Sequence, residues 1–289
     1  MSLFEFNSIF VIESLSGKLT GKDLYEDIIR RQSYYKYPDL KTKYFHIENK
    51  TDFLTILKTI GNWCVQEKCY PILHFEIHGD RDFKGLLLKS GELVDWKELY
   101  DILLEINISI KNNLFLTLAV CYGAYLMKVA APTINPAPFY AFIGSFDEIL
   151  ENDLILRYNE FYTEFFESLN INKALKKLHL ANPDIPSTFC YIDVEQIFIN
   201  IYKKHIYLSP KEKRERAHKA LSNYSWHSLK EKNICEEKFI RSIDIETKKF
   251  YKEAHRAYFM IDKYPENKSR FNIPDTLDEF RKYIQDNNL

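Results

Sequence analysis

Short apolar runs alternate with longer segments of helical spacing along the first 206 residues of the chain. The runs are rich in β-branched and aromatic residues, and those before residue 150 lie at 8–13, 44–47, 71–78, 114–120 and 139–144. A further run occupies 188–192. Strands that alternate with helices indicate parallel strands joined by crossover helices. We therefore predict an α/β fold, a three-layer sandwich in which helices flank a central, mostly parallel sheet of about six strands.

The segments between the runs predict the helices of this fold. Apolar residues recur at helical spacing near 21–31, after Thr51 as an N-cap residue, and at 96–104. A later helix has one broad apolar face, formed by Tyr158, Phe161, Tyr162, Phe165 and Leu169. Between the third and fourth runs, residues 83–93 predict a β-hairpin that turns at Ser90-Gly91.

The composition changes after residue 206. From about Leu208 onward the sequence is highly charged, and its apolar residues recur at helical spacing as far as Phe259. We predict two domains: an α/β domain at 1–206 and a helical C-terminal subdomain at 207–289, which is a candidate regulatory region.

Two of the predicted strands end in residues that can carry out chemistry. The run at 71–78 ends in His78-Gly79, and the run at 114–120 is followed by Cys121-Tyr122-Gly123. Parallel strands present their carboxyl ends at one edge of the sheet, which is where open α/β sheets bind ligands. A histidine and a cysteine that are distant in sequence and adjacent in the fold are what thiol-protease chemistry requires.

Each candidate residue also has a structural interpretation. A lone cysteine at the end of an apolar strand usually packs as a small hydrophobe, and a lone histidine is usually structural. Asp147 could cap the helix that begins near Glu151. The His78 and Cys121 pair at two strand ends favours the chemical interpretation for both residues.

A second cluster of polar residues lies within the third strand. His74, Glu76 and His78 alternate and so share one face, which suggests either a metal site or a carboxylate that orients His78. The pattern is not the His-Glu-x-x-His of zinc peptidases and is not on a helix, so we predict no metal. Cys64 and Cys69 lie at a predicted helix end without further ligands nearby, which favours packing.

The residues at the two strand ends resemble the histidine-glycine and cysteine-glycine boxes of caspase-like cysteine peptidases, the clan of caspases, separase and gingipain. The spacing is similar to the roughly 50 residues of the caspase signature, which ends in Gln-Ala-Cys-x-Gly. The glycine of that box is kept as Gly123, whereas Ala119 stands in place of the glutamine.

The closer likeness is to the CHAT branch of this clan, which is often found in bacteria beside repeat or signalling modules. In CHAT proteins and separase, the strand after the cysteine ends in a small residue, an aromatic residue and an acid. A helix with a Phe-Tyr pair and a later Ala-Leu pair follow. This chain has Gly144 to Asp147, then Phe161-Tyr162, then Ala174-Leu175, so the likeness covers roughly residues 7–185.

The resemblance implies peptide-bond hydrolysis through an acyl-enzyme, with a protein or peptide as substrate and no cofactor. Cys121 attacks the carbonyl carbon, and His78 supplies the proton that lets the amine leave. The backbone N–H groups of Gly79 and Cys121 hold the oxyanion. Asp147 contacts a basic P1 side chain, and Gly123 belongs to the substrate-binding residues.

Two other specificity devices of the clan are absent. Metacaspases place an acid two residues before the cysteine, where this chain has Ala119, and the missing glutamine removes support for a caspase-type preference for aspartate. The connection from Met127 to Pro138 has no long insertion that could be cut. We therefore expect activation by a ligand or a partner protein, and the resemblance implies a role in bacterial stress or antiviral signalling.

Two rival interpretations remain open. The Ala119-x-Cys121-x-Gly123 sequence also approximates the nucleophile elbow of α/β-hydrolases or amidotransferases, in which the histidine follows the nucleophile, as His179 or His205 would. Neither of these follows an apolar strand and precedes a glycine. The second rival is a catalytically silent caspase-like module that binds a partner.

Composition and charge exclude several classes of protein. No apolar run approaches the roughly 20 residues that span a bilayer, and the N-terminus lacks the features of a secretory signal. The net charge of −1, from 40 basic and 41 acidic residues, gives no electrostatic reason to bind nucleic acid. The five scattered cysteines suit a reducing compartment. We expect a cytoplasmic protein with neither a nucleic acid nor a membrane as partner.

Overall fold

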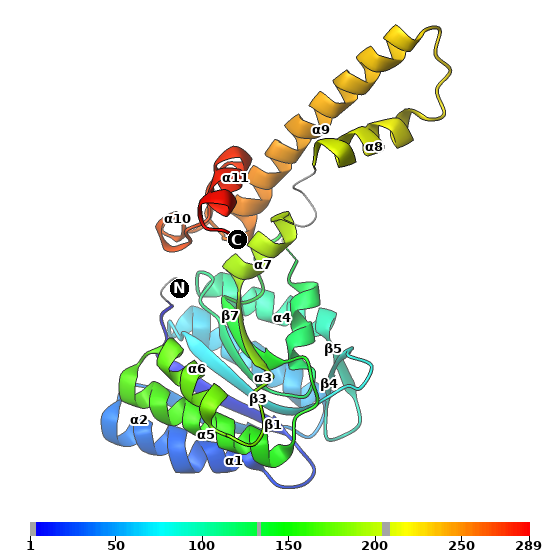
Figure 1. Cartoon of the computed structure of the whole chain (residues 1–289). Coiled ribbons are helices and arrows are strands. Elements are labelled where there is room, and N and C mark those ends of the chain that lie inside the picture. The colour runs from blue at the N-terminus through cyan, green and yellow to red at the C-terminus, as the bar shows by residue number, and fades with distance from the viewer. Residues whose placement is uncertain (1–3, 132–133, 204–208) are drawn as a thin grey trace. The chain divides into compact units, whose positions relative to one another are not determined.

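The computed structural model describes residues 4–131, 134–203 and 209–289 (Figure 1). These residues form two compact units that divide between Val194 and Glu195. The first unit contains the described residues before this point except 134–136, which belong to the second unit. The sequence suggested a boundary at 206–207, after the helix that begins at Val194 rather than at its start.

A mostly parallel sheet forms the centre of the first unit, as predicted. The strand order is β2-β1-β3-β6-β7-β8, and only β8 runs antiparallel to its neighbour. The strands are β1 (Ser8–Ser14), β2 (Lys41–His46), β3 (Pro71–Gly79), β6 (Phe115–Ala119), β7 (Ala141–Ser145) and β8 (Phe189–Asp193). Nearly every residue of the four inner strands is buried, because helices cover both faces of the sheet.

The helices lie in two layers, one on each face of this sheet (Figure 1). One layer contains α1 (Thr20–Leu24), the π-helical turn η1 (Tyr25–Ile29), α2 (Arg30–Lys36), α5 (Glu151–Ser168) and α6 (Ile171–Leu180). The other contains α3 (Lys50–Gln66) and α4 (Trp96–Ser109). The ring of His74 packs on Tyr158 of α5 at 4.9 Å, whereas Phe75 packs on Phe53 of α3 at 5.8 Å. Even-numbered residues of β3 therefore face α5.

The local signals at helix and hairpin ends are partly as predicted. The hairpin of β4 (Gly85–Leu87) and β5 (Leu93–Asp95) turns through Gly91, whose φ of 84° confirms the predicted turn. The predicted N-cap Thr51 is wrong, because Asn49 caps α3 by accepting a hydrogen bond from the Asp52 N–H. Thr51 lies inside the first turn, where a capping side chain has no role.

Five helices make up most of the described part of the second unit, in agreement with the predicted helical C-terminal region. They are α7 (Val194–Ile201), α8 (Pro210–Leu221), α9 (Leu229–Tyr258), α10 (Asn267–Arg270) and α11 (Leu277–Asp286). An aromatic cluster forms the core of this unit and includes Phe198, Tyr202, Tyr251, Phe259 and Phe280. Within the described part of the chain, no helix has both the length and the apolar character needed to cross a bilayer.

Candidate active site

The ends of β3 and β6 meet at the carboxyl edge of the sheet. These strands pair in parallel with Glu76 opposite Ala119, and the same register two residues further on sets His78 opposite Cys121. A Cβ atom at Gly79 would lie 1.7 Å from the carbonyl oxygen of Cys121. Since any side chain at residue 79 would overlap that oxygen, a glycine is required where the two strand ends meet.

His78 and Cys121 continue the alternation of residues that face α5. Further down the same strands, His74 Nδ1 lies 2.8 Å from Thr117 Oγ1, which in turn lies 2.8 Å from the Tyr162 hydroxyl of α5. His78 is exposed and Cys121 is half-buried. No hydrogen bond joins the His78 side chain to any described residue, so its imidazole has no partner that would hold it away from the cysteine.

The thiol of Cys121 contacts the segment between β7 and α5. Its Sγ accepts a hydrogen bond from the Ile149 N–H at 3.3 Å and lies 3.7 Å from the Ile149 carbonyl oxygen. In this structure the sulfur therefore contacts Ile149 and has no hydrogen bond to His78.

Two backbone N–H groups at the strand ends are suited to hold an oxyanion. The Asp80 N–H donates to the Gly85 carbonyl at 3.0 Å, which makes this antiparallel pair a hydrogen-bonded one. Hydrogen-bonded and non-hydrogen-bonded residue pairs alternate along an antiparallel ladder. Gly79, the adjacent residue, is therefore in a non-hydrogen-bonded pair with Leu86, and its N–H points away from β4. The Cys121 N–H has no acceptor among the described residues. These are the two groups named for this role from the sequence.

The turn after Cys121 brings Asp147 to the same edge. Tyr122 adopts a left-handed conformation, with φ of 61°, and its N–H donates to the Asp147 carbonyl at 3.1 Å. The Asp147 side chain is exposed. It does not cap α5, whose N-cap is Leu150 without a side-chain hydrogen bond. Gly123 is buried beneath the turn, where a Cβ atom would lie 3.2 Å from the Cβ atoms of Leu118 and Val120.

An aromatic cluster beside Cys121 was not anticipated from the sequence. Phe83 stacks on Tyr125 at 4.5 Å and meets Tyr122 edge-on at 4.8 Å, and Phe146 meets Tyr125 at 5.3 Å. Phe83 also has a positive φ, 62°, and strained residues of this kind concentrate at functional sites. The signal in the sequence is that aromatic residues follow each of the strand ends that carry His78, Cys121 and Gly144.

The other polar residues of β3 belong to a buried network below the candidate site. His74 Nε2 lies 3.2 Å from Glu76 Oε1, and Thr20 donates to Glu76 Oε2 at 3.0 Å. Glu76 therefore contacts His74 and Thr20, and its carboxylate does not orient His78. Glu13 stands opposite Glu76 on β1 and accepts hydrogen bonds from Gly21 N–H at 2.8 Å and the Tyr44 hydroxyl at 2.6 Å.

We predict that Gly79→Ala destabilises the first unit by about 1–3 kcal/mol, because the added methyl group overlaps the Cys121 carbonyl oxygen. The matched control is Gly17→Ala, since a Cβ atom there has nothing within 4 Å. Urea unfolding of the two variants and the wild type measures the difference. Equal stability of both variants would contradict the close approach of the strand ends.

We predict a pH-dependent stability that arises from Glu13. Burial is the largest effect and raises the pKa of Glu13 above its ordinary value of 4.5, with the nearby Glu76 acting in the same direction. The folded protein then binds this proton more tightly than the unfolded chain. The resulting stabilisation is present below pH 4.5 and is lost as the pH rises through the raised pKa.

The measurement is the unfolding free energy of the wild type and of Glu13→Gln at pH values from below 4.5 upward. We expect the wild type to lose stability relative to the variant as the pH rises. Glu92→Gln is a control of opposite sign. The Lys50 N–H and then the Ser90 hydroxyl lower the pKa of Glu92 below 4.5, so the stabilisation that Glu92 provides is lost as the pH falls. Curves for Glu13→Gln that run parallel to the wild type would contradict the raised pKa.

Of the two histidines named for the hydrolase-type rival, the structure describes His179, which has no contact with Cys121 among the described residues. His179 lies at the end of α6, where its Nδ1 is 3.0 Å from Ser187 Oγ. His205 lies outside the described residues. The strained residue of the turn is Tyr122 rather than Cys121, whereas a nucleophile elbow places the nucleophile itself at the strained position.

Comparison with known proteins adds no relative. Neither the models of known protein families nor the curated proteins gave a match to this chain. The arguments about function therefore rest on the residues of the site.

Proposed function

We propose that the protein is a caspase-like cysteine endopeptidase in which His78 and Cys121 form the catalytic dyad. The observation that carries the proposal is the contact of Gly79 with the Cys121 carbonyl, which sets the two strand ends side by side. The thiolate would attack the substrate carbonyl carbon, and the bond to the amine would break as His78 donates a proton to it. Water would then hydrolyse the thioester.

The environment of Cys121 supports this chemistry. The N–H groups of Gly79 and Cys121 are available to stabilise the oxyanion of the tetrahedral intermediate. Asp147 is exposed near the turn that follows the nucleophile, so its carboxylate would favour a basic side chain at P1. Gly123 would act only by shaping the turn, since it is buried.

The test is a cleavage profile on a peptide library that contains basic, acidic and apolar residues at every position. We expect cleavage after arginine or lysine by the wild type and none by Cys121→Ala. Asp147→Asn should lower kcat/KM for the basic peptides by about tenfold, since a carboxylate that contacts a charged ligand contributes on this scale. Equal cleavage by wild type and Cys121→Ala would overturn the proposal.

The contacts of the sulfur also support control of this activity. Ile149 occupies the side of Cys121 Sγ through both its N–H and its carbonyl oxygen, so we infer that a ligand or a partner protein that moves segment 146–150 raises a low basal rate of turnover. Full activity of the isolated protein would overturn this inference. Within the same proposal, the protein acts in the cytoplasm, in bacterial stress or antiviral signalling.

The same contacts favour a second candidate function. A module whose cysteine stays bound to Ile149 would bind a partner at this edge without turnover. Such a module would show equal partner binding with and without Cys121→Ala and no cleavage of any library member. Cleavage that depends on Cys121 excludes this candidate.

A further inference from the structure

A pocket of about 570 Å³ begins one residue beyond the contact with the candidate nucleophile. Ile149 touches Cys121 Sγ, and the next residue, Leu150, lines the pocket together with Leu156 of α5 and Ile185. This volume is within the range of ligand sites, ~300–1,000 Å³. The pocket and the nucleophile therefore border the same short segment.

Three aliphatic side chains in this pocket are exposed. The exposed fractions are 67% for Leu150, 39% for Leu156 and 37% for Ile185. A single exposed leucine is ordinary on a protein surface, but here the three side chains converge on one concave site. Their contact with water would be removed by an apolar group that fills the pocket.

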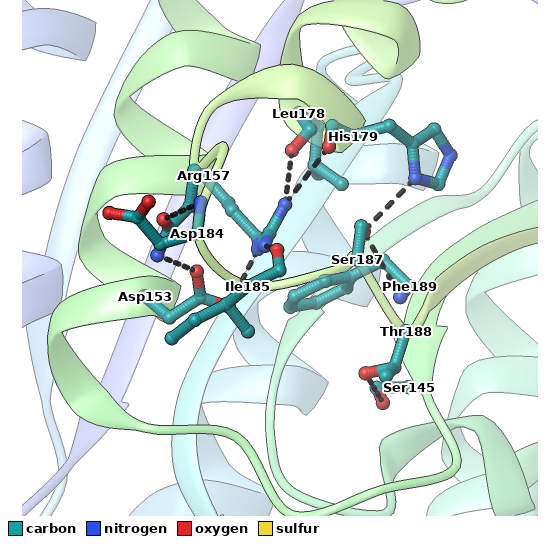
Figure 2. A network of polar contacts seen from close by, with 11 residues as sticks. Ser145, Asp153, Arg157, Leu178, His179, Asp184, Ile185, Ser187, Thr188 and Phe189 are labelled. Carbon is teal, nitrogen blue, oxygen red and sulfur yellow. Dashed lines mark hydrogen bonds and ion pairs between the residues drawn. The ribbon is translucent and has the colours of Figure 1, made fainter.

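A buried ion pair fixes the walls of the pocket (Figure 2). Arg157 is fully buried, and its Nε donates to Asp153 Oδ2 at 2.6 Å. Its two terminal nitrogens donate to the carbonyl oxygens of Leu178, His179 and Ile185. The Asn182 amide reaches the same carboxylate, with Nδ2 2.8 Å from Asp153 Oδ1. The guanidinium thus ties the wall that carries Ile185 to α5, so this wall of the pocket is preformed.

The charge of this pocket is also partly neutralised. Asp153 is paired with Arg157, which leaves Glu151 as the pocket's other carboxylate, and Glu151 is exposed. The remaining lining groups are the three aliphatic side chains and two asparagines, Asn152 and Asn182. An acidic side chain would face Glu151 across an apolar floor, which is unfavourable.

We propose that this pocket is a substrate subsite that binds a large aliphatic side chain, leucine or isoleucine, within a few positions of the bond cleaved by Cys121. The proposal rests on the peptidase function proposed above. An extended peptide advances about 3.3 Å per residue. Because Ile149 contacts Cys121 Sγ and the adjacent Leu150 lines the pocket, a peptide whose carbonyl carbon lies at Cys121 would reach the pocket with a side chain near the cleaved bond.

The test combines turnover with a binding measurement that does not need turnover. Fluorescent peptides carry leucine, alanine, aspartate or lysine at each position flanking the basic residue. We expect at least about a tenfold preference in kcat/KM for leucine over alanine at one position. Leu156→Asp should abolish this preference and raise the relative rate for lysine at that position, a gain that an unfolded variant cannot show.

Leu150→Asp provides a second variant that is expected to fold. Leu150 is the N-cap residue of α5, and its side chain makes no capping hydrogen bond. Aspartate is a favourable N-cap residue, so the substitution is compatible with the helix. The matched control is Val65→Asp, a 68% exposed aliphatic residue on α3 and outside the pocket. The control should keep the wild-type preference.

Binding of the same peptides to the Cys121→Ala protein distinguishes the two proposals. Cleavage with an unchanged leucine preference in both pocket variants overturns the subsite and leaves the peptidase function intact. Leucine-dependent binding without any wild-type cleavage overturns the peptidase function and leaves a peptide-binding pocket. Neither cleavage nor binding overturns both.

Discussion

Cys121→Ala should reduce peptide hydrolysis to the uncatalysed rate, and His78→Ala should lower kcat/KM by about 10²–10⁴-fold, the usual contribution of a general acid or base. The reason is the juxtaposition of the two strand ends, which sets the imidazole and the thiol on one face of the sheet. The measurement is kcat/KM on the best library peptide.

The double variant His78→Ala/Cys121→Ala should be no slower than Cys121→Ala alone, because residues that act as a unit have non-additive effects. Cys190→Ala is the matched control for the cysteine. Cys190 lies on β8 of the same sheet and is half-buried, and burial raises its pKa to about 11, so its thiol is protonated at neutral pH. His46→Ala is the matched control for His78→Ala, because His46 is also an exposed histidine at the end of a strand, β2.

Alkylation by a peptidyl chloromethyl ketone gives an independent check on the dyad. The reagent should modify Cys121 in the wild type and more slowly in His78→Ala, and peptide mapping identifies the labelled residue. Cys64 should stay unlabelled, because burial raises its pKa to about 12. Equal labelling of Cys121 in wild type and His78→Ala would show that the histidine does not assist the thiol.

The strand segments and the candidate dyad could be predicted because they depend on local patterns. Inner parallel strands are buried on both faces, so β1 and β6 appear in the sequence as largely apolar runs. The residues that end consecutive parallel strands then share an edge, which places His78 near Cys121 without any knowledge of the helices.

The contacts around the dyad depend on partners that are distant in sequence. The sequence does not indicate that the Ile149 backbone reaches Cys121, since backbone groups are the same at every residue. It also gave no reason to connect Glu76 with Thr20, because the hydrogen bond between them depends on how α1 packs on the sheet. Thr51 was misplaced as a cap because both Asn49 and Thr51 are good N-cap residues, and only the backbone decides between them.

Arg157 illustrates the same limit with a larger consequence. It directly precedes Tyr158, the first apolar position named for this helix, and an arginine on a helix is ordinarily exposed. In the structure it is fully buried, because Asp153 and three backbone carbonyls satisfy its donors. Two of these carbonyls belong to the end of α6, so the guanidinium also caps that helix (Figure 2).

Arg157→Met should therefore destabilise the first unit by about 3–5 kcal/mol, the usual cost of removing one partner from a buried ion pair. The variant leaves the Asp153 carboxylate buried without its cation and removes the donor to three carbonyl oxygens. Urea unfolding should be followed by fluorescence in a Trp226→Phe background, so that Trp63 and Trp96 report on the first unit alone.

Arg30→Met is the matched control, because Arg30 pairs with Glu26 at the same helical spacing while both side chains are exposed. Exposed pairs of this kind contribute little, so this variant should unfold at the wild-type urea concentration. Asp153→Asn in the Arg157→Met background should recover part of the lost stability, since it removes the unpaired charge. If Arg157→Met unfolded at the same urea concentration as Arg30→Met, the buried ion pair would not stabilise the first unit. The wall of the aliphatic pocket would then lack the fixed position on which the subsite depends.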